Sequence, residues 1–186
     1  LQAVRAERPR RAGRMAAGLE AVGISGSLEG AMAYVSNLQL ISRTHFARFL
    51  AEVGAVREMK DAFRKYLVPG KPGYVPHQWA VLADAVGWIR GAGGQAVLAH
   101  PGRYDLSAAA LDALLAEFRA AGGEAIEVVT GSHSPEQFRR FGAIAAQQNF
   151  AASRGSDFHG PEEGAEFGSL PPLDPGLRPV WRDWAL

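Results

Sequence analysis

The sequence predicts an α/β protein in which a helical segment precedes a parallel sheet. Residues 79–157 alternate three helical patterns with three short apolar runs. These runs are apolar on both faces, as in parallel strands covered by helices. The proline- and glycine-rich residues 69–74 separate this region from several short helical patterns. We therefore expect a helical subdomain over residues 1–75 and an α/β domain over residues 76–186.

The composition is that of an ordinary globular protein. Of the 186 residues, 47% are hydrophobic and 21% are charged, and the net charge of +1 favours no particular polyanionic partner. The absence of cysteine restricts any metal site to His, Asp and Glu ligands. No apolar run approaches the roughly 20 residues that span a bilayer, and no signal peptide is present, so we expect no membrane partner and a cytoplasmic location.

The helical subdomain is expected to contain four helices. Residues 1–23 are helical in pattern and end at Gly23, and Pro9 suits the first turn of a helix rather than its middle. The arginines of this segment form either a solvated face or a phosphate-binding edge. The second helix follows the cap Ser27, and the third follows the cap Ser42 or Thr44. The fourth covers residues 60–67. The histidines and lysine here, which we interpret mainly as non-ligands, are His45, His77 and Lys71.

The α/β domain is expected to alternate regularly. The predicted helices cover residues 80–91, 108–121 after the cap Ser107, and 135–148 after the cap Ser134, and the predicted strands cover residues 95–99, 125–129 and 150–153. In the first of these helices Val81, Ala85, Trp88 and Ile89 share one side. Trp181 and Trp184 in the irregular tail are expected to pack against the body.

Polar side chains follow each predicted strand. The first strand leads to His100 and Arg103, the third to Asp157 and His159, and the second contains Glu127 and leads to Thr130, Ser132 and His133. Asp157 and His159 are two residues apart, so in extended backbone they point to the same side. Because parallel strands end at one edge of a sheet, we expect His100, Asp157 and His159 to converge there.

Imidazole and carboxylate donors together suit Zn²⁺, Mn²⁺ or Fe²⁺. Such metals lower the pKa of a bound water to near neutrality and thereby supply a hydroxide nucleophile. We interpret Glu127 as structural and leave His133 open between a supporting role and none. The chain contains no G-x-S-x-G segment, no Walker P-loop and no H-E-x-x-H, which disfavours serine hydrolases, P-loop NTPases and zincin-type proteases.

Four segments have distinctive residue combinations: Ile-Ser-Arg-Thr-His-Phe-Ala-Arg at 41–48, Lys-Pro-Gly-Tyr-Val at 71–75, Val-Leu-Ala-His-Pro-Gly-Arg-Tyr at 97–104 and Gly-Ser-Asp-Phe-His at 155–159. Together they resemble the PHP (polymerase and histidinol phosphatase) superfamily, and within it the branch with 3′,5′-nucleoside bisphosphate phosphatase and 5′-to-3′ exoribonuclease activity. The resemblance implies the C-terminal part of a distorted (β/α)₇ barrel with an inserted helical subdomain. The family's His-x-His segment and the ligand motifs after it are not found in this chain. We therefore expect either the C-terminal part of a longer protein or a fragment whose partner, the N-terminal half of the barrel, is missing.

The resemblance also implies an enzyme, a metal-dependent phosphoesterase. It would remove the 3′-phosphate of nucleoside 3′,5′-bisphosphates, and act on the 5′ ends of short RNA, through attack of metal-bound hydroxide on phosphorus. His100, Asp157 and His159 would be catalytic metal ligands for up to three divalent ions, with Mn²⁺ favoured over Zn²⁺ or Fe²⁺. The arginines that would hold substrate phosphate are Arg11, Arg14, Arg43 and Arg103.

Two alternatives stay open at this point. One is a non-catalytic, nucleic-acid-associated module that uses the arginines of residues 5–14 to follow a phosphate backbone. The other is a PHP phosphatase that acts on a different small phosphate ester.

Overall fold

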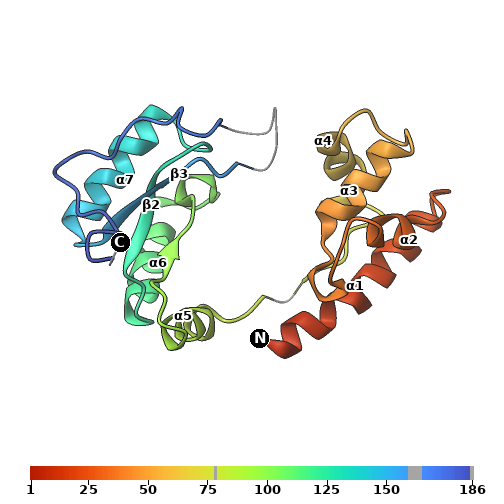
Figure 1. Cartoon of the computed structure of the whole chain (residues 1–186), viewed down its shortest axis with the longest axis horizontal. Helices are drawn as coiled ribbons and strands as arrows, with labels where there is room; N and C mark the ends of the chain where they lie inside the picture. Colours follow the sequence, from red (N-terminus) through yellow and green to blue (C-terminus); the bar gives the residue numbers. More distant parts are fainter. Residues whose placement is uncertain (78, 159–164, 185–186) are drawn as a thin grey trace. The chain divides into compact units, whose positions relative to one another are not determined.

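The computed structural model describes residues 1–77, 79–158 and 165–184 of the chain. Two compact units make up the fold, Leu1–Ala80 and Val81–Leu186 (Figure 1). The first unit is helical and the second is built on a parallel sheet, so the predicted α/β class with a parallel sheet is confirmed. No described helix is long and apolar enough to cross a membrane.

The first unit consists of short helices packed on one long helix. Its elements are α1 (Gln2–Glu20), α2 (Ser27–Met32), η1 (Leu38–Leu40), α3 (Arg43–Glu52), α4 (Met59–Ala62) and the π-helical turn η2 (Phe63–Leu67). Their core is made of fully buried apolar side chains such as Met15, Leu19, Phe46, Leu50 and Leu67. The spacing of Met15 and Leu19, one helical turn apart, places both on the inner side of α1.

In this unit one local prediction is corrected and one that was left open is decided. Pro9 lies inside α1, because the helix begins two turns before it and Arg5 already donates to the carbonyl of Leu1. Of the two candidate caps for α3, Ser42 is the N-cap and Thr44 lies within the helix. His45 is half-buried, and its Nδ1 accepts a hydrogen bond from the Ser42 N–H at 3.0 Å, so it serves the cap of α3.

The second unit alternates helix and strand as expected. Its elements are α5 (Leu82–Gly91), β1 (Val97–Leu98), η3 (Pro101–Arg103), α6 (Ala108–Ala120), β2 (Ala125–Thr130), α7 (Pro135–Gln147) and β3 (Ala151–Gly155). The strands are parallel in the order β1-β2-β3, and a bulge in β2 shifts the register between Glu127 and Val129. Residues 178–180 pair with β3 on its other side, through hydrogen bonds on both backbone groups of Ala152.

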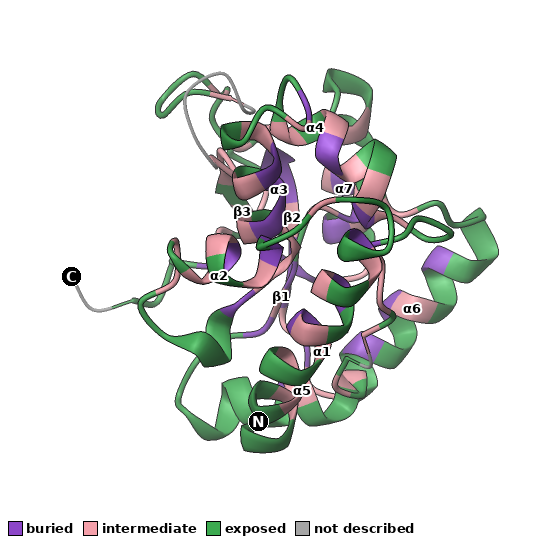
Figure 2. Cartoon of the chain, turned by 90° about the vertical axis from the view of Figure 1, so that its right-hand side faces the viewer, coloured by how far each residue is buried: buried purple, intermediate pink, exposed green. Residues whose placement is uncertain are grey.

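One face of the sheet packs against helices. Leu98, Ile126, Val128 and Ala152 point toward buried side chains of α5, α6 and α7, and Figure 2 shows the strands mainly as buried. The predicted apolar side of α5 is wrong, because Trp88 and Ile89 are 40% and 41% exposed. The side chains of α5 that pack into this core are the buried Val86 and the partly buried Leu82.

The opposite face borders an open pocket. The pocket has a volume of about 640 Å³, and Val97, Ala99, Glu127 and Ser153 of the strands line it. The tail lines it too, through Trp181 and Trp184, which are 42% and 56% exposed. The Nε1 of Trp184 donates to Oε1 of Gln95 at 2.6 Å, so the predicted packing of the tail against the body is confirmed at this residue.

Candidate functional site

His100 lies directly after β1, where the chain turns sharply. Its backbone is left-handed, with φ 31° and ψ 55°, which is uncommon for a residue other than glycine. Pro101 follows and begins the short helix η3. The Oε2 of Glu127, from the neighbouring strand β2, accepts a hydrogen bond from the His100 N–H at 2.6 Å. The strand that delivers His100 is therefore tied at its end to the middle of the sheet.

The loop after His100 is also held by the segment that follows β2. The Nε2 of His133 accepts from the Gly102 N–H at 2.9 Å, and the Nδ1 of His133 lies 3.0 Å from the carbonyl of Val128. Since a carbonyl can only accept, Nδ1 carries the proton and the ring is neutral. His133 is 7% exposed and stacks on Phe141. Both nitrogens are occupied, so His133 supports this loop and has no nitrogen left for a metal.

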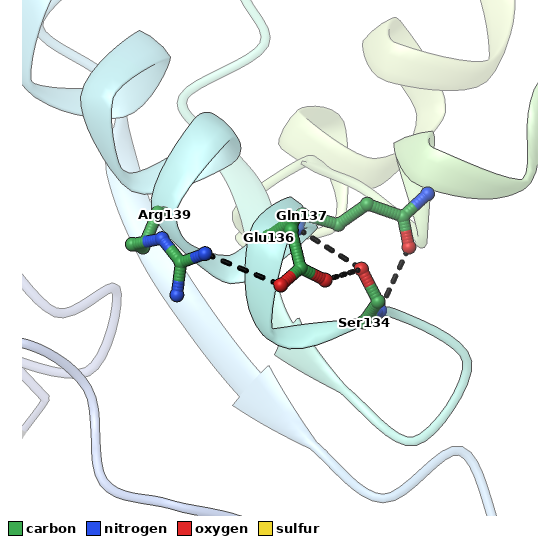
Figure 3. A network of polar contacts seen from close by, with 4 residues as sticks. All are labelled: Ser134, Glu136, Gln137 and Arg139. Atoms are coloured by element: carbon green, nitrogen blue, oxygen red, sulfur yellow. Dashed lines mark hydrogen bonds and ion pairs between the residues drawn. The ribbon is translucent and has the colours of Figure 1, made fainter.

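The start of α7 completes this support. Ser134 caps α7, and Gln137 closes the capping box by accepting from the Ser134 N–H at 2.8 Å, beside the ion pair of Glu136 with Arg139 (Figure 3). The amide nitrogen of the same Gln137 donates to the carbonyl of Gly102 at 2.9 Å. One side chain therefore joins the helix cap to the loop that carries His100.

Tyr104 encloses the loop from the other end. Its hydroxyl donates to the carbonyl of Ala99 at 2.7 Å, and its ring meets that of His100 edge-on at a centroid distance of 6.1 Å. Burial, with a further contribution from Glu127, raises the pKa of Tyr104 above its usual value. The hydroxyl therefore stays protonated at neutral pH and continues to donate.

Asp157 lies beyond the end of β3, with a left-handed backbone at φ 53°. One carboxylate oxygen is 3.7 Å from Nη1 of Arg103, which joins the end of β3 to the His100 loop. The predicted phosphate ligand Arg103 is thus paired with a predicted metal ligand. His159, the third predicted ligand, lies outside the described residues.

The donors present fit a divalent metal in kind. The Nδ1 of His100 is buried, as are Oγ1 of Thr130 at the end of β2 and Oγ of Ser132 after it, and none of the three has a hydrogen-bond partner within the described part of the chain. An imidazole nitrogen and a carboxylate are the donors expected for Mn²⁺ or Zn²⁺. Within the described ranges, however, no three His, Asp or Glu side chains come close enough together to hold a metal ion.

Arg11 and Arg43 lie near one another in the first unit. The Nε of Arg11 donates to the carbonyl of Val75 at 2.8 Å, and Nη1 of Arg43 donates to that of Leu67 at 3.2 Å. Burial, followed by the proximity of Arg43, lowers the pKa of Arg11. Each guanidinium group is thus held by a different backbone carbonyl, and guanidinium groups are the side chains that bind phosphate with paired hydrogen bonds.

The other basic candidates of this unit behave differently. Arg14 forms an ion pair with Glu7 at 2.6 Å, so its charge is already matched. His77 packs edge-on against Trp79, and its pKa is lowered first by burial and then by Arg11 and Arg8. Its environment is therefore cationic and favours the neutral ring.

Several supporting residues were not singled out from the sequence. Gln137, Gly102 and Tyr104 contact the His100 loop, and the available signal for Gln137 was its position three residues after the cap Ser134. Gly102 must be glycine, because an added Cβ would lie 2.7 Å from Nε2 of Gln137 and 2.8 Å from Nε2 of His133. That close approach joins residues about 30 positions apart and leaves no trace in local sequence.

Comparison with solved structures indicates a class of phosphoesterases. An inferred metal-dependent phosphoesterase from Bifidobacterium adolescentis is 28% identical, with a TM-score of 0.76 over 96% of this chain and 61% of that one. A structure of an amidohydrolase from Chromobacterium violaceum, with bound sulfate and no metal, is 53% identical, with a TM-score of 0.89 over 97% of this chain and 63% of that one. No protein-family model matches the chain.

The curated relatives are more particular. The chain is 53% identical, over 98% of its length, to a 3′,5′-nucleoside bisphosphate phosphatase from Chromobacterium violaceum, and 45% identical, over 95%, to the 5′-3′ exoribonuclease Rnm of Escherichia coli. It spans 65% and 60% of these two relatives. The resemblance indicated by the motifs is confirmed: the relatives of this chain have the names of this phosphatase and exoribonuclease branch, which is consistent with the PHP superfamily.

Proposed function

We propose that this chain is the C-terminal part of a metal-dependent phosphoesterase with a distorted (β/α)₇ barrel and an inserted helical subdomain. The observation that carries the proposal is the buried, unpartnered Nδ1 of His100 at a strand end, on a loop that an ion pair joins to Asp157. The named activities of the relatives support it. The predicted substrates are nucleoside 3′,5′-bisphosphates and the 5′ ends of short RNA.

In this proposal the residues have separate roles in metal binding and phosphate binding. His100 and Asp157, together with His159, would hold the divalent metal, for which Mn²⁺ is the first choice. When bound, the metal would supply an activated water and neutralise phosphate charge. Arg103 holds the carboxylate of Asp157, while Arg11 and Arg43 bind the phosphate that is not cleaved. The predicted cytoplasmic location and N-terminal partner half stay predictions.

The first test replaces Asp157 with Asn in the full-length protein. Asn tolerates the left-handed backbone of this position, so the substitution removes the charge with little strain. We expect phosphate release from adenosine 3′,5′-bisphosphate to depend on Mn²⁺ and to fall by about a thousandfold in Asp157→Asn. Asp112→Ala, on the exposed side of α6, is the control and should retain activity. Full turnover in Asp157→Asn would refute the site.

The second test concerns the arginine pair. Arg43→Ala should raise KM for the bisphosphate by about tenfold while leaving KM for a simple phosphomonoester unchanged, because only the bisphosphate has a second phosphate. Arg48→Ala is the matched control, since Arg48 lies on the same helix and its guanidinium lies over the ring of Tyr34. An equal rise in KM for both substrates would contradict the proposed role of Arg43.

A nucleic-acid-binding module is the second candidate, and the uneven distribution of charge favours it. Residues 1–80 contain 12 Lys and Arg against six Asp and Glu, whereas residues 81–186 contain eight against 13. A basic helical unit suits a phosphate backbone. RNA binding that persists without any Mn²⁺-dependent hydrolysis would favour this candidate over the phosphoesterase.

A further inference from the structure

Glu127 is the charged residue of β2, a strand whose other side chains are apolar or Thr130. It lies on the face of the sheet that borders the pocket, away from the helices, and is half-buried. A carboxylate at such a position loses hydration, so it requires a hydrogen bond to compensate. The donor present is the backbone N–H of His100, at 2.6 Å.

The backbone of His100 needs such a partner. Its left-handed conformation is disfavoured for a residue that carries a side chain, and it persists where the surroundings hold it. Pro101 after it disfavours the right-handed helical alternative. The contacts with Gly102 fix the loop after His100, whereas the bond from Glu127 acts on His100 itself.

A side-chain oxygen at this reach can accept the backbone N–H of His100 whether it belongs to a carboxylate or to an amide. The bond joins the middle of one strand to the end of the next, so it sets the direction in which the Cα–Cβ bond of His100 leaves the chain. The unpartnered Nδ1 of that imidazole is the donor that the proposed function requires. The backbone of His100, the metal ligand of the proposed function, is thus held by Glu127, a residue 27 positions away.

We propose that Glu127 is a positioning residue, which orients the imidazole of His100 toward the metal by accepting the His100 N–H, and which does not itself bind the metal. The inference rests on the proposed function, because it takes His100 to be a metal ligand. It goes beyond our interpretation of Glu127 as structural.

The experiment measures Mn²⁺ affinity by equilibrium dialysis of the full-length protein, and hydrogen exchange of the His100 amide in the metal-free protein. Glu127→Ala removes the acceptor, Glu127→Asp keeps the charge but is one methylene too short, and Glu127→Gln keeps an oxygen at the same reach. We expect Ala and Asp to weaken Mn²⁺ binding by about 10- to 100-fold and to speed exchange, and Gln to recover most of both losses. Glu117→Ala is the control, because Glu117 lies on the exposed side of α6.

Each outcome is decisive. If His100→Ala leaves Mn²⁺ affinity unchanged, the proposed function fails at this residue. If His100→Ala loses affinity and both Glu127→Ala and Glu127→Asp keep it, the positioning role alone is wrong. If Glu127→Gln is as weak as Glu127→Ala, Glu127 acts through its charge, which also overturns the inference. If Glu127→Ala does not fold, the comparison of Asp with Gln still separates reach from charge.

Discussion

At the scale of single residues, the candidate site depends on close packing around Gly102. The backbone of Gly102 bonds to His133 through its N–H and to Gln137 through its carbonyl, so both of its polar groups are used within the loop that follows His100. His133 cannot move away from Gly102, because its ring is buried, stacked on Phe141 and hydrogen-bonded to the carbonyl of Val128. A side chain at position 102 therefore has no space.

Gly102→Ala is expected to destabilise the second unit by about 1–3 kcal/mol, because the added methyl must displace Gln137 or His133. Urea unfolding monitored by tryptophan fluorescence measures this loss. Gly87→Ala is the matched control: Gly87 lies in α5, where an added Cβ would meet no atom within 4 Å, and alanine there should stabilise the helix by about 0.5–1 kcal/mol. Equal effects of the two substitutions would contradict the proposed crowding at Gly102.

At the scale of elements, the N-terminal ends of two helices show that the same capping arrangement can use side chains of different chemistry. Both α3 and α7 begin with a serine N-cap and a reciprocal bond from the third helical residue. In α7 that residue is Gln137, whose amide does not titrate. In α3 it is His45, whose Nδ1 accepts the Ser42 N–H only while the ring is neutral.

The stability contributed by the cap of α3 should therefore depend on pH. Burial, followed by Arg48, lowers the pKa of His45 below its usual value of about 6.5. Because the unfolded chain takes up the proton first, this stability is full above about pH 6.5 and is lost as the pH falls from there through the folded pKa. Urea midpoints between about pH 7.5 and about pH 5 measure the effect.

The control for this prediction is His45→Gln, which keeps an acceptor at the same helical position without a titrating group. It should retain the cap and show a smaller loss of stability over the same pH range. His45→Ala should lose about 0.5–1 kcal/mol at neutral pH. An unchanged pH dependence in His45→Gln would show that other groups govern acid sensitivity.

At the scale of the whole molecule, charge is divided between the two units. Although the net charge of the chain is only +1, residues 1–80 are basic and residues 81–186 are acidic. A polyanion such as RNA should therefore bind mainly through the helical unit. The affinity should fall as the salt concentration rises, because the counterions that binding releases then gain less free energy.

Replacing Arg5 and Arg10 of α1 with Ala should lower the salt dependence of binding to a 5′-phosphorylated single-stranded RNA. Both side chains are exposed, and two lost phosphate contacts should reduce the slope of log K against log salt by about 1.4. Fluorescence anisotropy at several salt concentrations measures it. The control replaces Arg139 and Arg182, exposed arginines of the second unit, and should leave the slope unchanged. Equal slopes for both double variants would contradict the assignment.

The sequence alone determined the α/β class, the strand order along the chain and the caps Ser107 and Ser134, because these follow from short-range periodicity and capping. It also placed His100 and Asp157 at strand ends and indicated the family. The predicted position of Pro9 and the predicted apolar side of α5 were wrong, because in both places the local residue pattern competes with packing that the sequence does not show.

Only the tertiary structure decided which polar residues support the site. His133, Gln137 and Glu127 reach the His100 loop across 27 to 35 positions of sequence. These contacts arise from the crossover connections of a parallel sheet, which bring distant strand ends to one edge. Hydrogen-bond partners at such separations are a property of the folded backbone, so no local pattern of residue types can specify them.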